Sequence, residues 1–215
     1  MIWWVYSRAK RSKRLNDVVA AIDDVRVEDV CKSMGIPYVL TSDDAPNHIH
    51  RIWEVSEKIE SDFYVSINGD EPLIKAENID LLLSDLSVVD GPFFKSVYRR
   101  MKDPAEVLDL ANVKIVLDEK GSCLYQSRHP IPSTKGSLLF DYKKAVGIEC
   151  FNKQALDFFV NTPMGTLEKI EDIDHLRFLE YGVGIQYVEI ESESISVDTP
   201  NDLEKVKKLM EHGNE

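Results

Sequence analysis

The feature that most constrains this 215-residue chain is an apolar strand at residues 64–68 that runs directly into the turn Gly69-Asp70-Glu71-Pro72. The strand alternates so little that it is best buried on both faces, as in a parallel sheet covered by helices. Ligands of such sheets bind in the crevice at the carboxyl ends of the strands, and Gly69 allows the backbone to approach a ligand closely. The pattern therefore places Asp70 and Glu71 at a ligand crevice. Two solvated acids in a strand-end turn would also explain a Gly-Asp pair on its own.

The rest of the chain alternates strands with helices, which predicts right-handed crossovers and a parallel α/β sheet. Strands are predicted at residues 17–22, 37–41, 92–98, 145–151 and 185–190, with a hairpin over residues 112–128. Helices are predicted at residues 3–14, 26–34, 46–59, 76–86, 154–160, 170–181 and 201–212. We expect a single domain over residues 1–215 with a doubly wound, mostly parallel sheet. A small β-rich lobe at about residues 105–150 is expected to pair subunits in a homodimer.

The composition argues against a membrane-spanning protein and against a secreted, disulfide-bonded one. No apolar run approaches the ~20 residues of a membrane span, and residues 1–6 are followed by basic residues, whereas a signal peptide has its charges before the apolar run. The three cysteines, Cys31, Cys123 and Cys150, are odd in number and far apart in the sequence. This usage predicts free thiols in a reducing compartment, and hence a cytoplasmic protein without a membrane partner.

The net charge of −12 argues against nucleic acid as a partner, because phosphate contacts need a basic surface. A nucleoside triphosphate is also strongly anionic. A nucleotide site in this chain would therefore need Mg2+ and a few well-placed Arg or Lys side chains to outweigh the overall charge.

The segment Asn68-Gly69-Asp70-Glu71-Pro72-Leu73-Ile74 resembles the Gln-Gly-Asp-Glu-Pro-Leu/Met-Ile motif of the 3-deoxy-manno-octulosonate (Kdo) cytidylyltransferases, also called CMP-Kdo synthetases. The resemblance implies a nucleotide-diphospho-sugar transferase fold. It implies that CTP and a 2-keto-3-deoxy sugar acid are the substrates, and that the CMP-sugar product serves cell-surface polysaccharide such as lipopolysaccharide. It also implies that Asp70 binds Mg2+ against the nucleotide phosphates, and that Asn68 and Gly69 lie at the substrate.

Residues 113–132 resemble a second motif of the family, Val-Lys-Val-Val-x-Asp followed by Gly, Leu-Tyr-Phe-Ser-Arg and Ile-Pro. The resemblance implies that Arg128 contacts the sugar acid, and an arginine fork suits a carboxylate. A surface arginine at a strand end is the alternative. Lys114, from the same motif, and Arg51 are expected to supply local positive charge.

Residues 166–182 resemble a third motif, Pro-Leu-Glu-x-x-Glu-x-Leu-Glu-Gln-Leu-Arg-x-Leu-x-x-Gly. The resemblance implies that Glu171 and His175 face the sugar, and their spacing of four residues predicts that they share one helix face. Helix amphipathicity alone would also explain most of this pattern. His175 stands where the family has glutamine.

Residues 196–203 resemble the family's Gly-Val-Asp-Thr-Pro-Glu-Asp-Leu, in which the aspartate at the position of Asp198 is the second Mg2+ ligand. Two carboxylates from distant parts of a chain suit a hard cation whose other ligands are phosphate and water. The alternative for Asp198 is an N-cap of the last helix.

The chain also departs from the family. The family opens with a strand and a phosphate-binding loop, Arg-x-x-Ser-x-Arg-Leu-Pro-Gly-Lys, which is absent here, and Met1 matches a position just after that loop. Of the family's His-x-Ser-Gly-Thr-x-Arg, which corresponds to residues 45–51, only Arg51 remains. Ala145 and Glu149 stand where the family has a His and a Tyr that border the sugar pocket.

Two alternatives follow from these departures. The changes at the sugar pocket favour a CMP-nonulosonate (sialic-acid-like) synthetase, and the missing loop favours a truncated, non-catalytic homologue. The family's opening strand lies between the strands here at residues 17–22 and 64–68. We therefore expect the 215-residue chain to be poorly stable and almost inactive in a thermal melt and a turnover assay, and an upstream extension to restore both properties.

Overall fold

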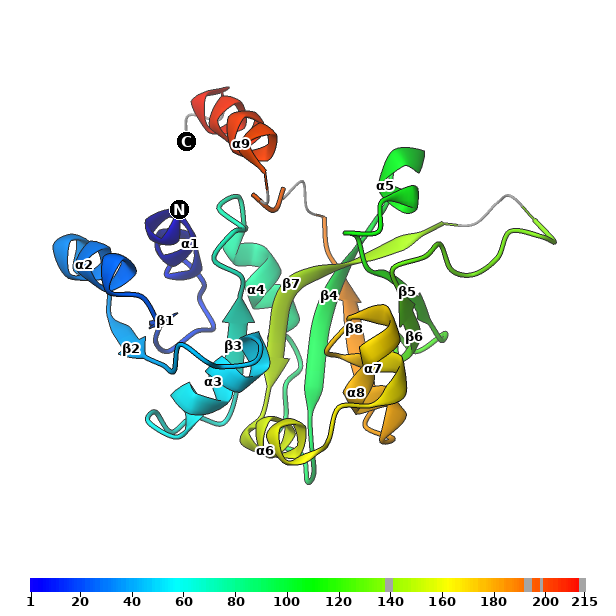
Figure 1. The fold of residues 1–215 in the computed structure, drawn as a ribbon, viewed down its shortest axis with the longest axis horizontal. Coiled ribbons are helices and arrows are strands. Elements are labelled where there is room, and N and C mark those ends of the chain that lie inside the picture. Colours follow the sequence, from blue (N-terminus) through cyan, green and yellow to red (C-terminus); the bar gives the residue numbers. More distant parts are fainter. Residues whose placement is uncertain (138–140, 192–194, 198, 213–215) are drawn as a thin grey trace.

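The structure, a computed structural model, describes residues 1–137, 141–191, 195–197 and 199–212. A central six-stranded sheet is flanked by helices, and the first two strands form a separate small sheet (Figure 1). The helices are α1 (Ile2–Ala9), α2 (Val25–Met34), α3 (His48–Ser56), α4 (Ala76–Leu82), α5 (Pro104–Leu108), α6 (Lys153–Asn161), α7 (Thr166–Glu171), α8 (Leu176–Glu180) and α9 (Pro200–His212). The strands are β1 (Ala20–Ile22), β2 (Tyr38–Leu40), β3 (Tyr64–Ile67), β4 (Phe94–Arg100), β5 (Lys114–Leu117), β6 (Cys123–Ser127), β7 (Lys143–Phe151) and β8 (Ile185–Glu189).

Strand β7 is the axis of the central sheet. It pairs antiparallel with β4 along its whole length, so β3 and β5 share its other edge: β3 pairs with residues 148–151 and β5 with residues 143–144. Because β3, β4 and β5 all oppose β7, these three strands run in one direction, and β8 runs parallel to β4. Only β7 and β6 run the other way among the described strands of this sheet. The predicted α/β fold with a mostly parallel sheet is confirmed.

Strands β1 and β2 pair with each other in parallel, with Ala21 opposite Val39, and form a sheet of their own. Among the described strands, β1 pairs with β2 alone and β3 with β7 alone. The two strands that the sequence places on either side of the family's opening strand thus belong to different sheets. The stability and activity expected of the 215-residue chain stay predictions.

The predicted hairpin over residues 112–128 is confirmed as β5 and β6. The carboxylate of Asp118 closes its turn by accepting hydrogen bonds from the backbone N–H groups of Lys120 and Ser122, both at 2.8 Å. Gly121 has a φ of 81°, which a residue with a Cβ adopts only with strain. The boundaries of the β-rich lobe and its role in dimerisation stay predictions.

The helices predicted over residues 46–59 and 76–86 are shorter in the structure, as α3 and α4. Two other predicted helices are wrong by more. The helix predicted over residues 170–181 is two helices, because Asp172 has a φ of 53° and ends α7, and α8 begins only after His175. The helix predicted over residues 3–14 ends at Ala9, because the carboxylate of Asp80 accepts hydrogen bonds from the backbone N–H groups of Lys13 and Arg14 at 2.9 and 3.2 Å. In both places side-chain and backbone contacts from outside the helix override the local pattern.

The core beneath the sheet is aromatic. The ring centroid of Phe94 on β4 lies 4.4 Å from the ring centroid of Phe151 on β7 and 5.0 Å from that of Phe178 on α8. The three cysteines are buried free thiols, as predicted. None of the helices in the described part of the chain combines the length and the apolar character needed to cross a membrane.

An ion pair lies buried between α7 and α8. The guanidinium of Arg177 donates to both carboxylate oxygens of Glu168 at 2.7 and 2.6 Å, and the two side chains are 5% and 2% exposed. Arg177 also donates to the carbonyl oxygen of Phe159 at 2.9 Å and lies over its ring, 3.8 Å from the centroid. The pair therefore holds α7, α8 and the end of α6 together across the break at Asp172.

We expect Glu168→Gln to lower the free energy of unfolding by about 3–5 kcal/mol, because it leaves the Arg177 charge buried without its partner. Urea denaturation followed by circular dichroism measures this loss. Glu204→Gln, which removes the same charge from an exposed pair with Lys207, is the matched control and should change the midpoint little. Equal midpoints for the two variants would contradict a bridging role for the buried pair.

Candidate active site

The carboxyl end of β3 meets the segment that precedes the last helix. The backbone N–H of Val197 donates to the carbonyl oxygen of Asp70 at 2.9 Å, and the hydroxyl of Ser196 donates to the carboxylate of Glu71 at 2.7 Å. Asp198 follows directly in the sequence and lies outside the described residues. The structure thus brings together the two motifs that the sequence assigned to one metal site.

Asn68 and Gly69 lie at the same strand end. The backbone N–H of Asn68 extends the ladder beyond β3 by donating to the carbonyl oxygen of Gly147 at 3.2 Å. The Asn68 side chain lies across Gly147, where a Cβ would approach its Nδ2 atom to 2.5 Å. A glycine on β7 is therefore what allows Asn68 to lie over the sheet beside the turn.

Arg51, on α3, reaches the carboxyl ends of the two strands of the small sheet. Its guanidinium donates to the carboxylate of Asp23 and to the hydroxyl of Thr41, both at 2.6 Å. Its positive charge is paired with Asp23, and the contribution to the substrate expected of it stays a prediction.

Arg128 and Glu171 form a clasp between the end of β6 and the end of α7. The Nε and Nη2 atoms of Arg128 donate to the carbonyl oxygens of Glu171 and Asp172 at 2.8 and 2.6 Å. The carboxylate of Glu171 accepts in turn from the backbone N–H of Arg128 at 2.9 Å. About a third of the Arg128 side chain is exposed. The clasp satisfies carbonyl groups that α7 leaves unpaired where it ends.

Glu171 and His175 do not share a helix face, which corrects the prediction from their spacing. Because the chain turns at Asp172, the Glu171 carboxylate faces Arg128, whereas the His175 ring points to Glu149 on β7. Their expected contacts with the sugar acid stay predictions.

Lys114, expected to supply charge to the substrate, is fully buried. Its ammonium group donates to the carbonyl oxygens of Asp109 and Asn112, both at 2.8 Å, and to that of Arg128. An ammonium group has three protons, so these three carbonyls use all of its donors. The structure therefore gives Lys114 a structural role, which is to hold the loop before β5 and the end of β6 together.

A cluster that sequence reasoning missed joins His48, Glu149 and His175. The Nε2 atoms of the two histidines lie 2.9 and 2.8 Å from the two different oxygens of the Glu149 carboxylate. The Nδ1 atom of His48 lies 3.5 Å from the carboxylate of Asp174. The signal was present in the sequence, because all three positions depart from the family motifs quoted above.

The cluster carries perturbed charges. Burial alone lowers the pKa of His48, but the carboxylates of Glu149 and Asp174 outweigh this effect and raise it to about 10. Burial alone raises the pKa of Glu149, but the two histidines reverse the effect and hold this pKa well below its ordinary range. Glu149 is therefore an ionised carboxylate whose charge is balanced within the protein.

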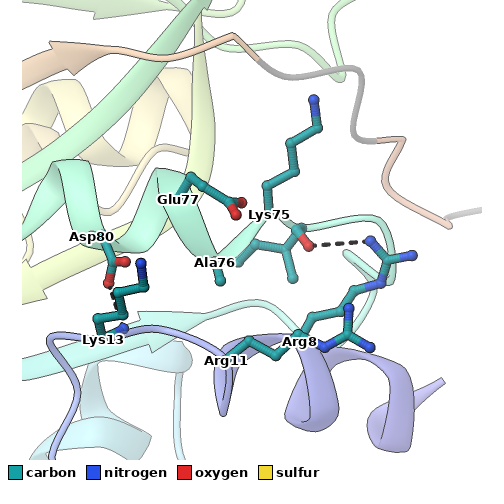
Figure 2. Close-up of a pocket in the computed structure, with 8 residues that line it drawn as sticks. Arg8, Arg11, Lys13, Lys75, Ala76, Glu77 and Asp80 are labelled. Atoms are coloured by element: carbon teal, nitrogen blue, oxygen red, sulfur yellow. Dashed lines mark hydrogen bonds between the residues drawn. The ribbon is translucent and has the colours of Figure 1, made fainter. Parts of the chain in front are cut away.

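A small pocket lies between α1 and the start of α4. Figure 2 shows Arg8, Arg11 and Lys13 from the α1 side of it, and Lys75, Glu77 and Asp80 from the α4 side. Its volume is about 160 Å³. That is below the ~300 Å³ at which pockets for small-molecule ligands begin. We assign this pocket no substrate.

A family model described as Cytidylyltransferase matches residues 1–210. The chain belongs to the cytidylyltransferase family. It is 34% identical over 219 residues to the mitochondrial 3-deoxy-manno-octulosonate cytidylyltransferase of Arabidopsis thaliana, covering 100% of this chain and 75% of that one. It is 37% identical over 210 residues to the 3-deoxy-manno-octulosonate cytidylyltransferase of Solibacter usitatus, covering 97% and 83% of the two chains.

A solved structure is also similar to this cytidylyltransferase. The CMP:2-keto-3-deoxy-manno-octonic acid synthetase in complex with CTP superposes with a TM-score of 0.92 at 31% identity, covering 98% of this chain and 87% of that one. The inositol-1-phosphate CTP transferase of T. maritima superposes with a TM-score of 0.59 at 16% identity, covering 86% and 70% of the two chains, which supports the fold alone.

We expect Lys114→Met to lower the free energy of unfolding by about 2–4 kcal/mol, because it leaves buried carbonyl oxygens without donors. Chemical denaturation measures the loss. Lys120→Met, in the exposed turn of the same hairpin, is the control and should leave the midpoint unchanged. A Lys114→Met protein that keeps full stability but loses turnover would restore the catalytic role predicted from the sequence.

Proposed function

We propose that this cytidylyltransferase transfers CMP from CTP to a 2-keto-3-deoxy sugar acid of the Kdo class and releases pyrophosphate. The observation that carries the proposal is the hydrogen bond from Val197 to Asp70, because it joins the two acidic motifs at the carboxyl end of a sheet strand. The relatives and the CTP complex described above support the same substrates.

Asp70 and Asp198 would hold Mg2+ in this proposal. The fit rests on chemistry and on position. Both residues offer carboxylate oxygens, which this hard cation prefers. The backbone N–H of Val197, the residue before Asp198, donates a hydrogen bond to the carbonyl oxygen of Asp70. A bound Mg2+ would neutralise phosphate charge in a chain whose own net charge is −12.

The remaining residues would position the substrates. The anomeric hydroxyl of the sugar acid attacks the α-phosphorus in line, and pyrophosphate leaves, so the protein contributes mainly alignment and charge neutralisation. The exposed part of the Arg128 guanidinium would bind the sugar carboxylate. Its other N–H groups would keep their hydrogen bonds to the carbonyl oxygens at the end of α7. Asn68 and Gly69 would border the nucleotide beside Asp70.

A nonulosonate substrate is the second candidate. Its support was the additional carboxylate of Glu149, which would repel a plain sugar acid. In the structure that charge faces His48 and His175 instead. Because the two histidines balance the Glu149 charge, that carboxylate no longer argues against a plain sugar acid, and the Kdo class is favoured. A homodimer formed through the β-rich lobe and a cytoplasmic location stay predictions.

We expect Asp70→Asn and Asp198→Asn each to lower turnover of CTP by at least about 100-fold with the fold retained, because each removes one carboxylate from the cation. Pyrophosphate release with CTP, Kdo and increasing Mg2+ measures the effect. Asp62→Asn, in an exposed loop, is the matched control. Near-native turnover by either variant at saturating CTP would refute the two-carboxylate site.

A further inference from the structure

A group of three potential metal ligands uses none of the residues proposed to hold Mg2+. His48 is the first residue of α3, Glu149 lies on β7 and His175 immediately precedes α8. Their nearest nitrogen and oxygen atoms all lie within 4.8 Å of one another. We propose that His48, Glu149 and His175 bind a divalent transition-metal ion, with zinc as the reference case, through the two Nε2 atoms and the Glu149 carboxylate.

Two of the three spacings fit a shared cation directly. The two histidine-to-carboxylate distances are 2.9 and 2.8 Å, and an edge of that length subtends roughly 85° at a metal whose bonds are ~2.1 Å long. The three donor atoms lie within 4.8 Å of one another, whereas two such bonds span at most about 4.2 Å, so the most distant pair would draw closer around the ion. In the structure each Nε2 is directed at a different oxygen of one carboxylate, and a cation between the two rings would replace the protons that join them. Binding would release protons.

The surroundings of the group are those of a preformed site. Glu149 is 4% exposed and His175 is 9% exposed, and the His175 ring packs edge-on against Phe94 with the centroids 4.8 Å apart. The side chain of His48 is 35% exposed, which leaves a route for the ion from solvent. Two of the ligands are therefore held by the core, and the third lies at the surface.

Asp174 supplies an outer contact. Its carboxylate lies 3.5 Å from Nδ1 of His48, the ring nitrogen opposite to the one that would bind the metal. A carboxylate at that position fixes the orientation of a ligating imidazole and makes it more basic. Once the imidazole protons have been released, the charges of Glu149 and Asp174 would be balanced by the divalent cation in their place.

The donor set selects the class of metal. Two imidazoles and one carboxylate suit zinc and neighbouring transition metals, whereas Mg2+ prefers oxygen donors throughout. The proposed site would therefore prefer a different ion from the Mg2+ site. Three protein ligands also leave at least one coordination position for water or another small ligand.

The test uses the full chain, stripped with EDTA and dialysed. We expect titration with Zn2+ to reveal one site per chain of micromolar affinity or tighter, and Co2+ to give visible absorption bands typical of nitrogen ligation. His175→Gln and His48→Gln should weaken binding at least about 100-fold and abolish those bands. Asp174→Asn should weaken it about 10–100-fold. His175→Gln is the key variant, because glutamine can still donate a hydrogen bond to Glu149 and so keep the fold.

His129→Gln is the matched control, because it removes one histidine far from the group along the chain. Zinc that binds equally well to the His129 and His175 variants, or only at millimolar concentration to the unaltered chain, would overturn the proposal. Circular dichroism checks that each variant is folded. Because the readouts are binding and absorption, they are independent of turnover, and a failure here would leave the proposed function unaffected.

Discussion

The ladder of backbone hydrogen bonds along β7 is the interaction on which the rest of the structure depends. One edge of this strand pairs with β4, and the other is divided between β3 and β5. The end of β3 that carries the Asp70 turn and the hairpin that leads to Arg128 are thereby fixed to one strand. The same strand has Gly147, over which Asn68 lies, and Glu149, which joins two histidines. Residues remote in the sequence are placed by a single rigid element.

Four cations in the described part of the chain are already engaged by the protein. Lys114 holds three carbonyl groups, Arg128 holds the end of α7, Arg51 pairs with Asp23, and Arg177 is buried with Glu168. In a chain of net charge −12, these four side chains contribute little to neutralising an anionic nucleotide. The arrangement explains in physical terms why a metal ion has such a large part in the proposed reaction.

Patterns that depend on neighbours in the sequence predicted the fold well. The strand before Gly69, the hairpin around Gly121 and the alternation of strands and helices all follow local rules and were confirmed. The burial predicted for both faces of that strand was wrong, because β3 buries alternate residues and pairs antiparallel with β7. The break at Asp172 was missed, because an amphipathic pattern continues across it while the chain takes up a left-handed conformation. The spacing in the sequence therefore predicted that Glu171 and His175 share one face. In the structure Glu171 contacts Arg128 after β6, and His175 contacts Glu149 on β7.

The positions of the candidate site residues were predictable where a motif is contiguous and unpredictable where partners come from separate elements. The sequence placed Asp70 at a strand end, and the structure brings Val197 to it. No local pattern could reveal that the buried ammonium of Lys114 would meet three carbonyls, because two of them come from the loop before it and one from the hairpin's far strand. Such contacts depend on the tertiary fold.

The buried carboxylate of Glu149 makes the contributions of three separate elements interdependent. A carboxylate on β7 with neither histidine in place would be an isolated charge in the core, and such a charge is strongly destabilising unless the carboxyl group stays protonated. A histidine at position 48 or 175, by contrast, can be neutral and brings no such penalty. The effects of substitutions at these three positions on stability therefore do not add, because the cost of each depends on which of the other two residues is present.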